Sequence, residues 1–254
     1  MLGTIMAEFR KLLTVRSTYF IVLISLAIVA LFAGFGDGYK ASAAYIHSPG
    51  LLANESASAI VFIGIILALA SLLLMGHEYR YNTIMHTLTA VNHRRKVLFA
   101  KFVAITLFAL TTALIMTFFA PLCTIIGTHL ANKHMAAQHF PAWTVLGHTL
   151  FVGWGYVMYA FIIVSIIRSQ VGSIVTFLII PLIGENIIGN IFKSTSKYLP
   201  FSSLQAVVHT EMLDSAQDTA QQVASTAHNI IVASCYIAVG LLVSYILFIR
   251  RDAN

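Results

Sequence analysis

The sequence has few charged residues: Asp, Glu, Lys and Arg make up 9% of its 254 residues. A soluble domain carries about 25% charged residues, so this chain cannot cover a surface that faces water. Hydrophobic residues make up 59% of it, which predicts a polytopic membrane protein. The net charge of +6 comes from basic residues beside apolar segments, a membrane-protein pattern, and does not predict nucleic-acid binding.

Motifs for nucleotide binding and catalysis are also absent. No Gly-Lys dipeptide occurs, so there is no Walker A loop to hold a nucleotide phosphate. His-Glu-x-x-His and Gly-x-Ser-x-Gly are absent too. The only two cysteines, Cys123 and Cys235, fall in apolar stretches and are predicted to be packing residues. We therefore expect neither an enzyme nor a cofactor bound by this chain.

The ten histidines do not predict a metal site. His129, His134 and His139 share one polar segment but are five residues apart. On a helix that spacing turns the chain by about 140°, so neighbouring members would not share a face. Metal binding needs convergent ligands, and no metal ligand is assigned.

Six apolar stretches are long enough to cross a bilayer as helices, which takes about 20 residues each. The first is too long for a signal peptide's apolar core, and we expect it to be retained. The prediction is an all-α membrane protein, with residues 1–254 forming one domain. The expected spans cover residues 18–36, 57–76, 98–125, 146–167, 171–190 and 229–249.

Basic residues alternate between the two sides of these spans. Eleven of the fifteen Lys and Arg residues fall on the side of the termini, and Lys40, Lys133, Lys193 and Lys197 fall on the other. Because cytoplasmic loops are enriched in Lys and Arg, both termini are predicted to be cytoplasmic in a plasma membrane.

The first fifteen residues have a helical pattern of their own. Glu8, Arg10 and Lys11 lie opposite an apolar stripe, which predicts an amphipathic helix along the cytoplasmic leaflet. The segment is either a flank that only sets topology or an elbow helix that enters the first span laterally. The stripe consists of Leu2, Ile5, Met6, Phe9, Leu12 and Leu13, and the elbow assignment covers Phe9, Arg10, Lys11 and Arg16.

The segment after the second span combines charge with helical spacing. Ile84, Met85, Leu88 and Val91 recur at that spacing and predict a short amphipathic helix. Glu78 lies close to the end of the second span, where a lone carboxylate is costly. Its candidate partners are Arg80, Arg16 and Lys101. The alternative is an ordinary basic loop that fixes topology.

These features together resemble an ABC type-2 transporter permease. The resemblance rests on the basic N-terminal helix, the six spans, the Glu78-x-x-x-Asn82-Thr83 stretch, and Arg followed by Lys at the third span. The family pattern has Gly where this chain has Asn82. The resemblance covers nearly the whole chain. It implies that the segment between the second and third spans is a coupling helix that docks on a separate ATPase. The coupling residues would be Glu78, Tyr79, Arg80, Asn82, Thr83, Ile84, Leu88 and Arg94.

The fifth span is interrupted by Pro181, Gly184, Glu185 and Asn186. Such breaks at membrane depth need protein or a water-filled cavity beside them. The resemblance implies short outer re-entrant helices here, for which Ile187–Phe192 and Tyr198–Val208 are suited. Glu185, Asn186 and Phe62 are candidates for a substrate path. The alternative is that the span ends near Pro181 and Glu185 is solvated.

The resulting hypothesis is the membrane subunit of an ATP-driven exporter of a hydrophobic or amphipathic substrate: a peptide, drug or lipid-like molecule. The resemblance implies two copies of a partner ATPase that carries ATP and Mg. It also implies a second permease half, either an identical copy or a paralogue, and contact with membrane lipids. The alternatives are an ATPase-independent carrier or channel, and a membrane immunity or scaffold protein.

Overall fold

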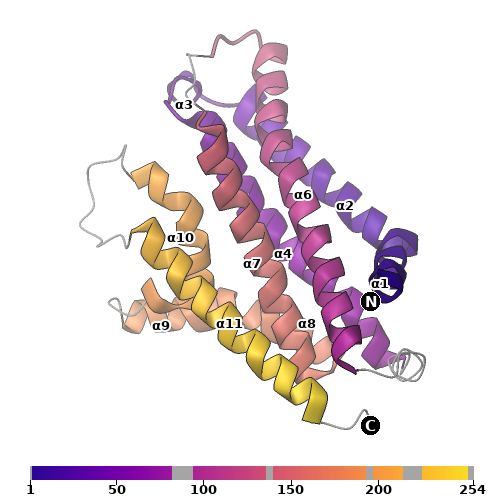
Figure 1. Ribbon diagram of the computed structural model, residues 1–254. Helices are drawn as coiled ribbons and strands as arrows, with labels where there is room; N and C mark the ends of the chain where they lie inside the picture. Colours follow the sequence, from indigo (N-terminus) through magenta and orange to yellow (C-terminus); the bar gives the residue numbers. More distant parts are fainter. Residues whose placement is uncertain (1, 82–93, 136–139, 193–196, 214–224, 251–254) are drawn as a thin grey trace.

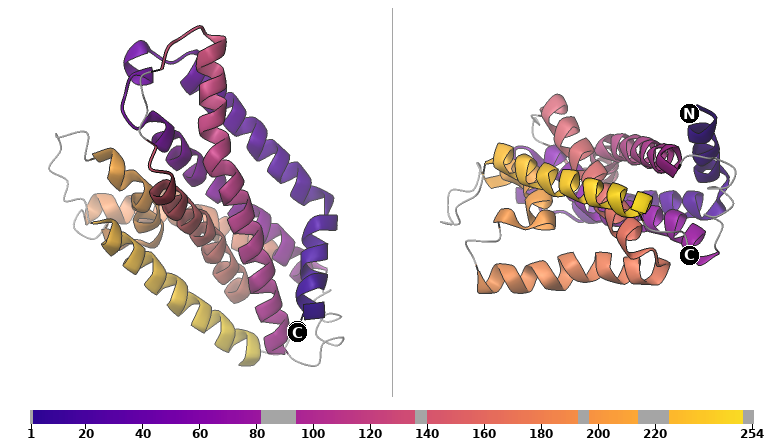
Figure 2. Two further views of the ribbon diagram at one scale, coloured as in Figure 1. Left: turned by 45° about the horizontal axis from the view of Figure 1, so that its top comes forward. Right: turned by 60° about the horizontal axis from the view of Figure 1, so that its bottom comes forward.

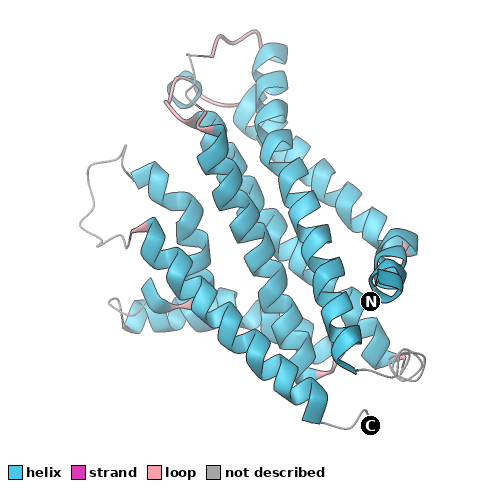
Figure 3. Ribbon diagram, viewed as in Figure 1, coloured by secondary structure: helices cyan, strands magenta, loops and turns pink. Residues whose placement is uncertain are grey.

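The computed structural model describes residues 2–81, 94–135, 140–192, 197–213 and 225–250 (Figure 1). All regular secondary structure within these ranges is helical (Figure 3), which confirms the all-α prediction. The elements are α1 (Leu2–Thr14), α2 (Arg16–Val29), η1 (Ala30–Tyr39), α3 (Ala43–Ile46), α4 (Leu51–Arg80), α6 (Arg94–Leu130), α7 (Ala142–Ile167), α8 (Gln170–Ile179), η2 (Ile180–Gly184), α9 (Glu185–Ile191), α10 (Pro200–Leu213) and α11 (Thr226–Arg250).

Within the described ranges, six helical segments are long and apolar enough to span a membrane, which confirms the predicted six spans of a multi-pass membrane protein. Several extend beyond the predicted boundaries, because helical hydrogen bonding continues into polar residues that a search for apolar stretches leaves out. The second span, for example, begins at Leu51 and ends at Arg80. The six segments are Thr18–Tyr39, Leu51–Arg80, Arg95–Leu130, Ala142–Ile167, Gln170–Ile191 and Thr226–Arg250.

Helices α4 and α7 form the centre of the bundle (Figure 1). In their most apolar parts 56% and 67% of the residues are buried, against 17% in the first, fifth and sixth spans. Glycines allow the two helices to approach closely: a Cβ at Gly64 would lie 2.5 Å from the ring of Tyr156. The remaining spans pack around this pair and keep large apolar faces exposed.

The first span changes its helix type halfway. Its second half, η1, is a π-helix that packs against α6 through glycines: a Cβ at Gly127 would lie 1.9 Å from the carbonyl oxygen of Gly34. Lys133 closes the end of η1 by donating to the carbonyls of Tyr39 and Ala41, at 2.6 and 2.7 Å. Nothing in the sequence pattern predicted the π-helical geometry.

The fifth span does not break at Pro181. A π-helical turn, η2, accommodates the proline, and α8, η2 and α9 form one continuous rod (Figure 2, right). In a wide turn of this kind the hydrogen-bond pattern shifts, so the helix continues although proline has no N–H to donate. The prediction of a separate helix over Ile187–Phe192 is therefore wrong, because α9 continues the span through Ile191. The second predicted segment corresponds to α10, which packs against α7 and α11.

Candidate functional site: a buried charge cluster

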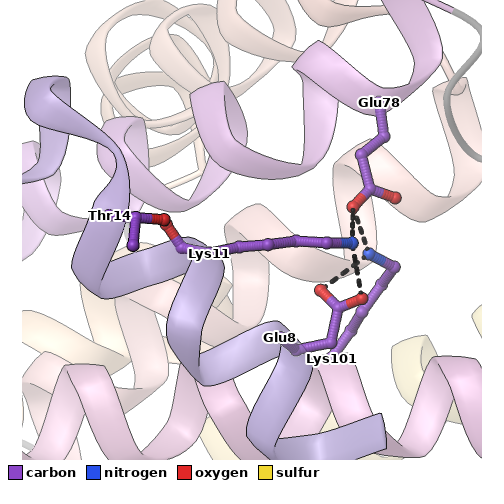
Figure 4. A network of polar contacts seen from close by, with 5 residues as sticks. All are labelled: Glu8, Lys11, Thr14, Glu78 and Lys101. Carbon is purple, nitrogen blue, oxygen red and sulfur yellow. Dashed lines mark hydrogen bonds and ion pairs between the residues drawn. The ribbon is translucent and has the colours of Figure 1, made fainter.

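Four charged side chains from three elements meet at the end of the bundle where α1 lies (Figure 4). Glu8 and Lys11 belong to α1, Glu78 to the last turn of α4, and Lys101 to the second turn of α6. We call these four residues the charge cluster. They connect the N-terminal helix to both helices that flank the segment between the second and third spans.

Each lysine bridges both carboxylates. The Nζ atom of Lys101 lies 2.7 Å from Oε1 of Glu78 and 3.0 Å from Oε2 of Glu8. The Nζ atom of Lys11 lies 2.9 Å from Oε1 of Glu8 and 3.1 Å from Oε1 of Glu78. Among the described residues, two positive and two negative groups therefore form a set of four ion pairs.

Burial makes this arrangement energetically important. The side chain of Lys101 is 3% exposed, that of Glu8 9% and that of Glu78 12%. Buried charges are tolerated only when paired, and removing one member leaves the others uncompensated at a cost of about 3–5 kcal/mol. The cluster therefore favours one relative position of α1, α4 and α6.

Lys11 is the most exposed member, at 46%. Burial lowers its pKa, but the hydrogen bond to Glu8 and the negative charges of Glu78 and Glu8 outweigh that effect. The net result is a pKa for Lys11 that is raised above its usual value. Lys11 thus keeps its proton and its positive charge within the cluster.

A cavity of about 440 Å³ lies beside the charge cluster. The four cluster residues line one part of it, together with His77 and Tyr81. Aliphatic side chains of α1, α4 and α6 line the rest, among them Leu12, Met75 and Ile105. The cluster is therefore packed in a partly apolar environment, where charge pairing is stronger than in water.

Of the three partners proposed for Glu78, Lys101 is the one that the structure pairs with it. Arg80 instead lies over the ring of Tyr81, with its guanidinium carbon 5.5 Å from the ring centroid. Tyr79 is partly buried, and its hydroxyl has no hydrogen-bond partner among the described residues. Asn82, Thr83, Ile84 and Leu88 lie outside the described residues; Arg94 begins α6.

Sequence reasoning missed Glu8, which it placed on the polar side of the amphipathic helix. In the structure Glu8 and Leu12 are buried toward the bundle, whereas Met6 and Leu13, both in the apolar stripe, are about half exposed. Among the elbow candidates, Phe9 is partly buried and Arg10 and Arg16 are exposed. The i, i+3 spacing of Glu8 and Lys11 was the one sequence signal for their pairing.

Glu185 has a structural role that the sequence did not indicate. Its carboxylate accepts hydrogen bonds from the backbone N–H groups of Phe201 and Ser202, both at 2.7 Å, and from the Ser202 hydroxyl at 2.6 Å. These amides belong to the first turn of α10, so Glu185 caps that helix from a distance. It is 6% exposed, so the alternative of a solvated carboxylate is wrong.

The other two candidates for the substrate path lie apart from Glu185. Asn186 is exposed and donates to the carbonyls of Pro181 and Leu182, within its own helix. Phe62, on α4, lines a second cavity together with Asp37 and Glu55. The structure therefore does not bring Glu185, Asn186 and Phe62 into one site.

Among the residues with described positions, no three His, Cys, Asp or Glu side chains are arranged to hold a metal ion. Of the histidines considered above, His139 lies outside the described ranges.

Comparison with known proteins identifies the family of the chain. No curated protein matches the chain. Residues 4–184, well over half of the sequence, match the family described as ABC-2 family transporter protein. The match includes all four members of the charge cluster, the first four spans and part of the fifth, up to residue 184. The chain belongs to the ABC-2 family of transporter proteins and is a membrane-spanning permease of that family.

Proposed function

We propose that this chain is the permease subunit of an ATP-driven exporter, and that a separate ATPase acts on the segment between α4 and α6. The observation that carries the proposal is the bridge that Lys101 makes to both Glu78 and Glu8. It ties together the two helices entering and leaving that segment, with α1 beside them. The ATPase would bind ATP and Mg, and this chain would bind neither.

The charge cluster is suited to transmit a force from the ATPase to the transmembrane helices. A force on the segment between residues 82 and 93 acts on α4 and α6 together, because their ends are held by buried ion pairs. Helix α4 is central in the bundle, so its displacement would move the packing against α7. Two arrangements of the bundle, biased by ATP binding to the partner, would then give alternating access.

The distribution of charge supports a cytoplasmic orientation of both termini. The end with the charge cluster also carries the excess of Lys and Arg, which favours the cytoplasm. We therefore place both termini and the ATPase on the cytoplasmic side of the plasma membrane. The exposed apolar faces of the first, fifth and sixth spans leave room for a second permease half, identical or paralogous, and for lipid. They also favour a hydrophobic or amphipathic substrate.

Co-purification with a co-expressed ABC ATPase tests the proposal. We expect the wild-type chain to retain the ATPase through purification in a mild detergent. Arg80→Glu, which reverses an exposed charge beside the segment, should lose most of it. Lys40→Glu makes the same reversal on an exposed residue at the opposite end and should retain it. Substrate transport in vesicles that contain no ATPase would contradict the proposal.

A further inference from the structure

A second cavity, of about 270 Å³, lies between the first span and α4, toward the end of the bundle that carries α3. Phe32 and Asp37 line it from the first span, and Glu55 and Phe62 line it from α4. We call it the acidic cavity. It lies far along α4 from Glu78, and the charge cluster takes no part in it.

The acidic cavity contains two carboxylates and no basic lining residue. Glu55 is 4% exposed and accepts a hydrogen bond from the Tyr45 hydroxyl at 2.8 Å. Within the described part of the chain, neither Glu55 nor Asp37 has an ion-pair partner. Carboxylates at membrane depth are costly unless a positive charge accompanies them.

Two described lysines at this end of the bundle, Lys40 and Lys133, make other contacts. Lys133 donates to two backbone carbonyls at the end of η1. Lys40 lies over the ring of Phe35, 4.7 Å from its centroid. Among the described residues, no basic side chain pairs with either carboxylate of the cavity, so both are available to a cation.

The walls of the cavity add an apolar and aromatic component. Phe32 is 64% exposed and Phe62 48% exposed, so both rings are open to a ligand. Aromatic faces attract quaternary ammonium groups through cation–π interactions, and they also pack against hydrocarbon groups. Complete small-molecule sites occupy about 300–1,000 Å³, so this volume suits a head group or a small ring.

We propose that the acidic cavity binds the ammonium group of an amphipathic cation, between Asp37 and Glu55, with Phe32 and Phe62 against its apolar part. The proposal names a substrate class and so rests on the proposed function. The same chemistry is offered by a soluble amphipathic amine and by the head group of phosphatidylethanolamine, and the test separates these two sources.

The test is calorimetric titration of the purified full chain, in a non-ionic maltoside detergent, with benzyltrimethylammonium. We expect saturable binding to the wild type. Asp37→Asn should weaken it at least tenfold, and Asp37→Asn combined with Glu55→Gln should abolish it. Asp252→Asn removes a carboxylate that lies outside the described residues and should leave the affinity within twofold of the wild type.

A second pair of variants tests the aromatic wall. Phe62→Leu should weaken binding several-fold, whereas Trp143→Leu, at an exposed aromatic outside the cavity, should not. Competition then identifies the source of the cation. Displacement by dihexanoylphosphatidylethanolamine and not by dihexanoylphosphatidylglycerol assigns the site to the lipid head group. Failure of both to displace the probe assigns it to a soluble amine.

Absence of binding to the wild type would overturn the proposal. An affinity of Asp37→Asn within twofold of the wild type would also overturn it. The Asp37 side chain makes no described hydrogen bond, and the unfolding temperature of the variant is measured alongside to confirm that it folds. The titration contains no ATPase, so its result is independent of the co-purification. If Arg80→Glu fails to retain the ATPase and the wild type does not bind the ammonium probe, the proposed site is wrong and the proposed function is still supported.

Discussion

The two polar regions of this bundle handle buried charge in opposite ways. In the charge cluster two lysines and two glutamates satisfy one another, with every pair at or below 3.1 Å. The acidic cavity has two carboxylates and no basic residue in its lining. A balanced set of buried charges fixes the positions of helices, whereas an unbalanced one within a cavity favours a ligand of opposite charge. The same residue types thus predict a mechanical role at one end and a binding role at the other.

The strongest test of this contrast is to unbalance the charge cluster. Lys101→Met keeps most of the length of the side chain but leaves Glu8 and Glu78 with only Lys11. We expect a loss of about 3–5 kcal/mol in the free energy of unfolding, measured by denaturant titration in detergent micelles. Lys40→Met, which removes an exposed lysine, should cost less than about 1 kcal/mol.

Inverting all four charges provides the matching rescue. The combination of Glu8→Lys, Lys11→Glu, Glu78→Lys and Lys101→Glu retains each of the four opposite-charge pairs. We expect it to recover much of the stability lost in Lys101→Met. If the inverted chain is no more stable than Lys101→Met, pairing is not what holds these helices.

The wall of the acidic cavity depends on close packing between η1 and α6. Gly127→Ala would place a methyl group 1.9 Å from the Gly34 carbonyl oxygen, so η1 must move away. Overpacking of this kind costs about 1–3 kcal/mol, and we expect both a lower unfolding midpoint and weaker ammonium binding. Gly36→Ala, in η1 itself and with nothing within 4 Å of its Cβ, is the control and should leave both unchanged.

Glu185 represents a third arrangement, in which backbone amides satisfy a buried carboxylate. Glu185→Gln replaces one acceptor oxygen by a donor that faces an N–H group. We expect a loss of about 1–2 kcal/mol, similar to the loss of other helix caps, and a destabilised α10. The neighbouring Asn186→Ala should cost less, because its hydrogen bonds are local and exposed. Equal effects in an unfolding titration would exclude the capping role.

The smallest expected effect concerns the exposed edge of the charge cluster. The folded pKa of Lys11 is raised above 10.5, so its contribution is complete below pH 10.5 and is lost as the pH rises through the folded value. Lys11 is half exposed, which limits the effect to below about 1 kcal/mol. Melting at pH 8 and pH 11.5 should show a smaller alkaline loss in Lys11→Met than in the wild type. Equal losses would remove Lys11 from the ion-pair set.

The sequence predicted those features that depend on composition and spacing. Six spans follow from six apolar stretches, and Lys101 was among the partners proposed for Glu78. The inward position of Glu8 could not be predicted, because it depends on how α1 packs against α4 and α6. The helical spacing of the sequence places Glu8 on the polar face of α1. Pro181 was expected to interrupt the fifth span, and a helix end near it was the alternative, but a π-helical turn accommodates the proline. The cap formed by Glu185 joins segments sixteen residues apart, which no local pattern shows.

The most direct test of coupling is photo-crosslinking from the segment between α4 and α6. Leu88 is replaced by p-benzoylphenylalanine, and the chain is purified with its ATPase and irradiated with and without ATP. We predict a crosslink to the ATPase whose yield changes with ATP, and none when Tyr45, beside the acidic cavity, is replaced in the same way. A stable complex that crosslinks from position 45 and not from position 88 would contradict the assignment of the ATPase to the end of the bundle that carries the charge cluster.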